Sequence, residues 1–260
     1  MTRSVEAVRA LLAVAATCLA LEAAAAPSWL PDVPSEWTRI TPGPVDVGGT
    51  VYRPTCSGFP GTDPGFHFWV KRGSVDAAVV FFEGGGACWD GFTCTFPIGT
   101  GLPYQFYKPA ILPTDDPRTY AGIFDLGNPA NPVRDWTFVY VPYCTGDVHL
   151  GSATRTYPNA GVPGLPAEFS IRHRGFDNFM VVLDWMRGHL GDPNRMLVTG
   201  SSAGAYGAAG NFPWIARAWP RAHLDVLADA GQGGTTVPWD YGGPGRESWN
   251  LTLPPTVVAP

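Results

Sequence analysis

A Gly-Ser-Ser-Ala-Gly pentapeptide at residues 200–204 places Ser202 at the centre of a G-x-S-x-G pattern. The pattern follows an apolar run ending at Thr199 and precedes a stretch of small residues that begins at Ala203. A strand, a sharp turn and a helix in that order expose the central serine hydroxyl at the carboxyl edge of a sheet. We therefore predict that Ser202 is the nucleophile of an acyl-transfer reaction. The alternative is a Gly/Ser turn that only caps a helix.

A second segment suited to the same chemistry reads Glu-Gly-Gly-Gly at residues 83–86, directly after an apolar run. Acyl transfer needs N–H donors aimed at the negative oxygen that develops on the substrate. One donor comes from the residue after the nucleophile, here Ala203, and the other from a loop after an earlier strand. Glycines allow such a loop to approach the substrate closely. A phosphate-binding loop is excluded, because neither Lys-Ser/Thr nor G-x-G-x-x-G spacing is present.

The elements that must position these two segments can be read from hydrophobic patterning. Apolar and β-branched runs predict strands at 76–82, 136–141, 196–199 and 224–228. Apolar residues at helical spacing predict a helix at 176–190, and small residues predict another at 203–217. Strands that alternate with helices indicate an α/β fold with a mostly parallel sheet and flanking helices. Residues 97–133 and 143–170 are rich in Pro and Gly, and we expect long binding loops or lids there.

Four segments follow one another in the chain: CSGFPGTDPGFH at 56–67, FEGGGACW at 82–89, YCTGDVH at 143–149 and GSSAG at 200–204. Together, in this order, they resemble the pectin acetylesterase/Notum family. The resemblance extends over roughly residues 50–235. It implies a secreted carboxylesterase of the α/β-hydrolase fold that uses a Ser-Asp-His triad to remove an acyl group, here expected to be acetyl. The implied substrate is an acylated carbohydrate or another ester, such as a protein ester.

The resemblance assigns roles to particular residues of this chain. It implies that Ser202 is the nucleophile and that Gly85, Gly86 and Ala203 form the oxyanion hole. It implies no metal and no organic cofactor. Two alternatives remain open at this point. One is a non-catalytic secreted remnant or binding protein of the same fold, and the other is a secreted serine peptidase or polyester depolymerase.

The base and the acid of the triad are not found by pattern. In this fold the chain order is Ser, then Asp or Glu, then His. His223 is the only histidine after Ser202, but it precedes a strand and so is expected at the wrong edge of the sheet. Asp229 ends that strand, yet its surroundings resemble a family segment that is not the triad acid. His149 could replace the base, although a structural role is favoured. Because the family places Asp and His further along, we expect a chain truncated at its C-terminus, whether as a fragment, a pseudogene product or a mis-assigned gene.

Four cysteines follow the first 26 residues, at positions 56, 88, 94 and 144. An even number in an exported chain predicts two disulfides, for which three pairings exist. The short spacing favours Cys88 with Cys94, which leaves Cys56 with Cys144. The family resemblance also matches Cys88–Cys94 to a local disulfide. A zinc site would need C-x-x-C or matching histidine spacing, which the sequence lacks.

The N-terminus has the pattern of a secretory signal peptide. Arg3 and Arg9 precede an apolar run at 10–21, and small residues follow at 23–26. We predict a signal peptide at 1–26 and a single, incomplete α/β-hydrolase-like domain at 27–260. A buried N-terminal helix, or a lipoprotein signal at Cys18, are the alternatives. The predicted location is secreted or periplasmic, with no membrane attachment after cleavage.

The charge balance limits the partners. The formal net charge is −5 and the isoelectric point is about 5.5, whereas a nucleic-acid-binding protein needs a basic surface. We therefore expect no nucleic-acid partner, and we expect a monomer that acts on an ester substrate.

Overall fold

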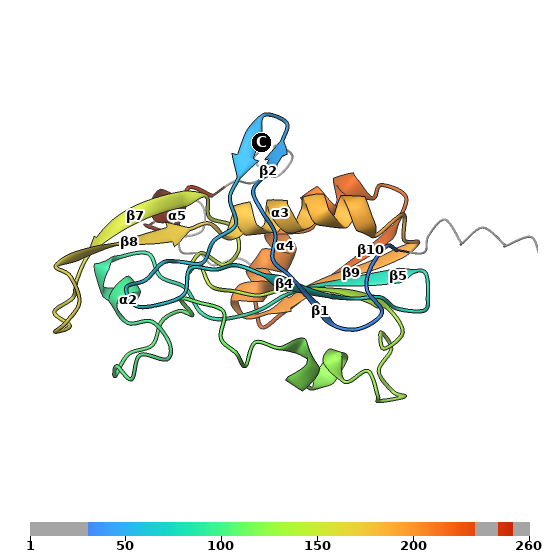
Figure 1. Ribbon diagram of the computed structural model, residues 1–260, viewed down its shortest axis with the longest axis horizontal. Helices are drawn as coiled ribbons and strands as arrows, with labels where there is room; N and C mark the ends of the chain where they lie inside the picture. The colour runs from blue at the N-terminus through green and yellow to red at the C-terminus, as the bar shows by residue number, and fades with distance from the viewer. Residues whose placement is uncertain (1–30, 232–243, 252–260) are drawn as a thin grey trace, which may run out of the picture.

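A computed structural model describes residues 31–231 and 244–251, and the predicted signal peptide at 1–26 lies outside this part. The centre is a six-stranded sheet in the order β1-β4-β6-β5-β9-β10 (Figure 1). Its strands are β1 Thr38–Ile40, β4 Phe68–Lys71, β5 Ala77–Phe82, β6 Thr137–Val141, β9 Arg195–Ser201 and β10 His223–Asp229.

The four strands predicted from the sequence form the parallel part of this sheet. β6, β5, β9 and β10 pair in parallel, so their carboxyl ends meet at one edge. The prediction of a mostly parallel sheet is therefore confirmed. Sequence analysis did not identify β4 and β1, which extend the sheet beyond β6 in antiparallel orientation. Both strands are short, and a three- or four-residue run gives a weak alternation signal.

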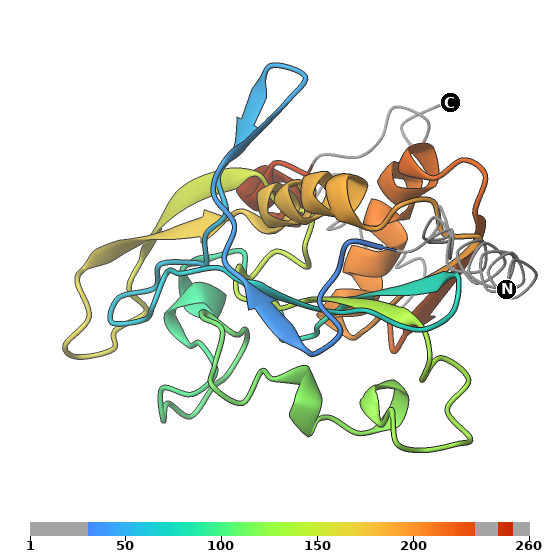
Figure 2. The same ribbon diagram turned by 45° about the vertical axis from the view of Figure 1, so that its right-hand side comes forward.

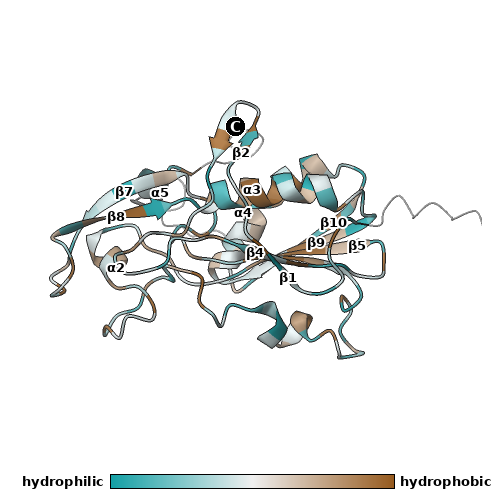
Figure 3. Cartoon of the chain, in the orientation of Figure 1, coloured by the Kyte–Doolittle hydropathy of each residue, from teal (hydrophilic) through white to brown (hydrophobic). Residues whose placement is uncertain are grey.

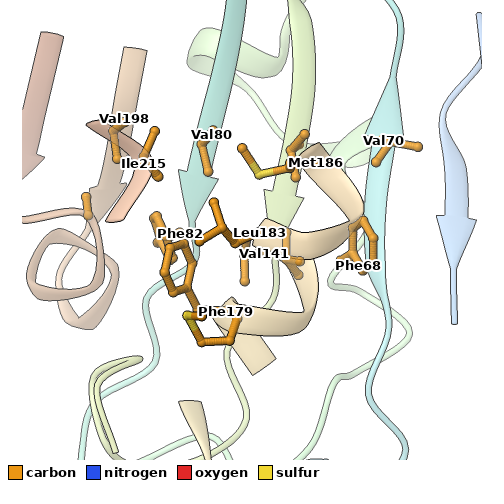
Figure 4. Packing of buried hydrophobic residues seen from close by; sticks show 14 of the residues in the cluster. Phe68, Val70, Val80, Phe82, Val141, Phe179, Leu183, Met186, Val198 and Ile215 are labelled. Carbon is orange, nitrogen blue, oxygen red and sulfur yellow. The ribbon is translucent and has the colours of Figure 1, made fainter. Parts of the chain in front are cut away.

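Two helices cover one face of the sheet. They are α3 Gly175–His189 and α4 Ala203–Ala218, close to the predicted bounds. In Figure 3, α3 carries both hydrophobic and hydrophilic residues, and its buried apolar residues belong to the same core as those of the sheet. Leu183 and Met186 of α3 pack against Val80 and Phe82 of β5 in the main core (Figure 4). Burial of such side chains contributes roughly 1.5–3 kcal/mol each.

The opposite face of the sheet is covered by the segment between β5 and β6 (Figure 2). This segment contains two short 3-10 helices, η1 Pro117–Thr119 and η2 Gly122–Phe124. Because successive residues of a strand point to opposite faces, Val79 and Phe81 of β5 pack on this side with Phe124. The long loop predicted at 97–133 therefore both connects β5 to β6 and packs against this face of the sheet.

The prediction of one long loop at 143–170 was wrong in part. This region contains β7 Ala153–Pro158, which pairs antiparallel with β8 Glu168–His173. The signal was present in the sequence, since buried Phe169, Ile171 and His173 alternate with exposed residues. A second hairpin joins β2 Val45–Val47 and β3 Thr50–Tyr52. The remaining helices are α2 Gly91–Thr95 and α5 Pro244–Trp249.

Both expected disulfides are present. Cys56 is bonded to Cys144 across 88 positions of sequence, and Cys88 to Cys94 across 6. All four residues are buried. A disulfide lowers the entropy of the unfolded chain, and it does so more when it closes a longer loop. The Cys56–Cys144 bond is therefore expected to stabilise the fold more than the Cys88–Cys94 bond. Among the described residues, no helix has the length and apolar character needed to cross a membrane.

Candidate active site

Ser202 stands at the sharp turn between β9 and α4, with φ 57° and ψ −122°. A positive φ is unfavourable for serine and is typical of a nucleophile held on a strained turn. Two glycines allow this turn. A Cβ atom on Gly204 would lie 2.0 Å from the carbonyl oxygen of Phe82, and one on Gly200 would lie 2.4 Å from that of Gly204. The Ser202 N–H donates to the carbonyl of Asp229 at 2.9 Å, which ties the turn to β10.

The Gly84–Gly86 loop lies directly against this serine. A Cβ atom on Gly84 would stand 3.2 Å from Cβ of Ser202 and 2.6 Å from the carbonyl oxygen of Ser201. Gly86 has φ +72°, and a Cβ atom there would meet the carbonyl oxygen of Phe106 at 1.9 Å. Glycine is therefore required at both positions.

Of the predicted oxyanion-hole residues, Ala203 directly follows Ser202, and Gly85 and Gly86 directly follow Gly84, which contacts the Ser202 turn. Within the described part of the chain, the N–H groups of Gly85, Gly86 and Ala203 donate to no other group. Unpaired N–H groups at a loop and at a helix N-terminus can bind a developing negative charge.

All five histidines of the chain lie in the described part, and none of them is hydrogen-bonded to Ser202. His223 is exposed at the amino end of β10, beside Arg195, as the sequence analysis expected. His149 is buried, and its Nε2 donates to the carbonyl of Glu83 at 2.8 Å. Burial lowers the pKa of His149 to about 4, so the ring is neutral at pH 7. His149 therefore lies behind the glycine loop as a structural donor.

Two aspartates occupy different environments near the loop and the turn. Asp229 ends the exposed strand β10 and, with Ser201 and Tyr120, lines a hollow of about 360 Å³. Asp147, in contrast, is buried. Its carboxylate accepts from the Gly175 N–H at 2.7 Å and from the Thr145 hydroxyl at 2.6 Å. Burial raises the pKa of Asp147 to about 6.

Among the described residues, one group of possible metal ligands lies close enough together to hold an ion. Ligand atoms of Cys88, Cys94 and His173 lie within 4.8 Å of one another. The two sulfur atoms form a disulfide, however, and the His173 nitrogens contact the Tyr157 hydroxyl and the Thr145 carbonyl. Cysteine binds zinc as a thiolate, and no thiolate is present while the two sulfur atoms are bonded to each other. These three residues therefore do not form a zinc site in this state.

Residues 54–232 match the family model described as pectinacetylesterase. This chain belongs to the pectinacetylesterase family. A curated relative is the palmitoleoyl-protein carboxylesterase notum2 of Xenopus laevis, 27% identical over 166 residues. The matched region covers 62% of this chain but 30% of the frog protein. The chain therefore corresponds to a minor part of that relative's length.

A solved structure shows the same fold in this family. The structure of the Wnt deacylase Notum from Drosophila superposes with a TM-score of 0.50 at 19% sequence identity. The superposition covers 83% of this chain and 62% of the fly chain. The likeness confirms the α/β-hydrolase fold predicted for this pectinacetylesterase-family chain.

Sequence analysis missed the polar residues that surround the family's glycine loop. Glu83, Lys108 and Tyr120 form a connected group beside Gly84–Gly86. The one sequence signal for this polar group was the position of Glu83 immediately before the glycines. Lys108 and Tyr120 lie in irregular segments without periodicity, so no pattern assigned them a partner.

Proposed function

We propose that this protein is a secreted or periplasmic serine carboxylesterase that removes acetyl groups from an acylated carbohydrate. The observation that supports it best is the contact between the Gly84–Gly86 loop and the strained Ser202 turn. Acyl transfer requires a nucleophile and, next to it, unpaired N–H donors that stabilise the developing oxyanion.

In the proposed mechanism, Ser202 Oγ attacks the acyl carbon while a base accepts its proton. The N–H groups of Gly85, Gly86 and Ala203 stabilise the tetrahedral oxyanion. The alcohol then leaves with a proton and an acyl-enzyme remains. Water attacks the acyl carbon, releasing the acid and restoring Ser202. None of the chain's five histidines is hydrogen-bonded to Ser202, so none is assigned as the base. The mechanism uses no metal or cofactor.

An exposed group of aromatic side chains beside the loop supports a carbohydrate substrate. Phe92 and Tyr104 are 48% and 53% exposed and contact each other and Phe106. The carbonyl of Phe106 lies against Gly86, so the group continues from the oxyanion position. Partly exposed aromatic side chains suit the apolar C–H face of a sugar ring, whereas a long acyl chain needs an enclosed cavity. Tyr107, in contrast, is buried in the core.

Two observations support export. Both disulfides are buried parts of the fold, and such bonds persist in oxidising compartments. The arginines and the apolar run of residues 1–26 fit a signal peptide.

A non-catalytic binding protein of the same fold is the second candidate. It is favoured by one observation, namely that no histidine is hydrogen-bonded to Ser202. A serine without a base is a weak nucleophile.

Hydrolysis of p-nitrophenyl acetate by the purified, oxidised protein, beside a Ser202→Ala variant, separates the two candidates. We expect the unaltered protein to hydrolyse the ester and Ser202→Ala to lower the rate at least about 10³-fold, because alanine has no hydroxyl group to attack the acyl carbon. Equal background rates in both proteins would favour the binding protein. Acetate release from an acetylated polysaccharide, compared with a peptide and a polyester, then tests the substrate class.

A further inference from the structure

The residue before the glycine loop, Glu83, has a largely buried carboxylate, its side chain 12% exposed, which interacts with three donors. The backbone N–H of Tyr143 donates to it at 2.8 Å and the Tyr120 hydroxyl at 3.1 Å. The Lys108 ammonium forms the third contact as a buried ion pair. Burial raises the pKa of the Glu83 carboxyl, while these donors favour its ionised form.

Lys108 contacts the same loop twice. Its ammonium pairs with Glu83 and also with Asp115, at 2.8 Å from the latter. Its backbone N–H donates to the carbonyl of Gly85 at 2.8 Å. The side chain and the main chain of one residue therefore fix two successive parts of the loop.

The fixed carbonyls determine where the loop's N–H groups point. In a planar trans peptide, the N–H of one residue points opposite to the carbonyl of the residue before it. The bond from Lys108 to the Gly85 carbonyl therefore aims the Gly86 N–H away from Lys108. In the same way, the bond from His149 to the Glu83 carbonyl orients the Gly84 N–H.

Close packing leaves the loop little room to rotate. A Cβ atom on Gly85 would lie 2.6 Å from the Tyr143 ring and 3.1 Å from Cβ of Lys108. Rotation of the Gly85 peptide would break its bond to Lys108 and drive the loop into these groups. The oxyanion position is thus held by side chains that do not themselves reach the serine.

We propose that Glu83 and Lys108 are positioning residues that hold the Gly84–Gly86 loop in the orientation needed to bind the oxyanion. This inference rests on the proposed function, because it concerns the same site. Lys108 is the more sensitive member, since its removal leaves the carboxylates of Glu83 and Asp115 buried without their cation.

The test compares Glu83→Gln and Lys108→Met with Asp192→Asn, which removes an exposed ion pair with Arg221 instead. Hydrogen–deuterium exchange followed by mass spectrometry measures the mobility of the peptide covering residues 83–88. Kinetics with p-nitrophenyl acetate separate kcat from KM.

We expect faster exchange of the peptide covering residues 83–88 in both loop variants. We also expect kcat to fall about tenfold in Glu83→Gln and about 100-fold in Lys108→Met, with KM within about twofold, because an oxyanion donor acts in the transition state. Asp192→Asn should match the unaltered protein in both readouts.

Unchanged exchange in the loop, or a kcat within about twofold of the unaltered protein in both loop variants, would overturn the proposal. A rise in KM alone would also contradict it, since that indicates lost substrate binding. If Lys108→Met does not fold, Glu83→Gln and Tyr120→Phe carry the test, because both keep the size of the side chain. If the unaltered protein hydrolyses no ester, the proposed function fails, and the exchange data still decide whether these side chains hold the loop.

Discussion

On one side of Ser202 the Gly84–Gly86 loop is enclosed by buried, hydrogen-bonded side chains, whereas on the other side β10 is open to solvent. Tyr143 and His149 pack behind the loop, and Glu83 pairs with Lys108 beside it. β10 pairs with β9 along one side and exposes Val226 at 47%. The two sides meet at the turn, where the Ser202 N–H donates to Asp229.

The difference shows which part of the proposed active site is held in place by contacts among the described residues. Donors fixed in a buried polar network keep their direction and cost little reorganisation during the reaction. The loop side meets this condition. The β10 side supplies the backbone contact that holds the turn, but no histidine to accept the serine proton. The proposed oxyanion site is therefore held in place by contacts that do not involve a base.

The largest expected effect breaks the enclosed side directly. Gly86→Ala would place a Cβ atom 1.9 Å from the Phe106 carbonyl oxygen, so the loop must move. We expect kcat for p-nitrophenyl acetate to fall about 100-fold or more, as for loss of an oxyanion donor. Gly99→Ala is the matched control, because Gly99 also has a positive φ, +88°, but nothing within 4 Å. It should cost only about 1–2 kcal/mol of stability. Equal kcat values in the two variants would show that the loop has no catalytic role.

A smaller effect concerns the charge state behind the loop. His149 has a pKa of about 4 in the folded protein against an ordinary value of 6.5. Between these values the unfolded chain binds more protons, so His149 makes the free energy of unfolding decrease as pH falls from 6.5 to 4. Asp147, with its pKa raised to about 6, acts in the opposite direction.

The difference between the unaltered protein and His149→Phe isolates the histidine contribution. Urea unfolding at several pH values should show that the variant lacks this decrease, which amounts to about 3 kcal/mol at most. Parallel pH profiles for the two proteins would mean that His149 is not held neutral behind the loop.

The smallest expected effects come from a matched pair of valines across the sheet. Val198 of β9 and Val226 of β10 are register partners, yet Val198 is fully buried and Val226 is 47% exposed. We expect Val198→Ala to lower the free energy of unfolding by about 2 kcal/mol and Val226→Ala by about 0.5 kcal/mol or less. Urea denaturation measures both. A similar cost at the two positions would show that β10 is covered in solution and would remove the contrast between the two sides.

Local patterns were sufficient for much of this architecture. The G-x-S-x-G pattern located the Ser202 turn, and apolar and β-branched runs indicated the four parallel strands, because both signals depend on neighbouring residues. The short spacing of Cys88 and Cys94 indicated their disulfide for the same reason, whereas the bond between Cys56 and Cys144, 88 positions apart, was assigned as the remaining pair. The β7–β8 hairpin was missed although residues 168–173 alternate clearly, since the surrounding prolines and glycines favoured a loop.

The sequence by itself therefore determined the turn at Ser202, the glycine loop and the class of fold, because each depends on short runs of residues. Only the tertiary structure determined that Lys108 and Tyr120 reach Glu83 across 25 and 37 positions of sequence. It also determined that His149 and Asp147 are buried, and that β10 is exposed. These outcomes depend on which segments are packed together, and a charged or aromatic residue in an irregular loop carries no periodic signal that identifies its partner.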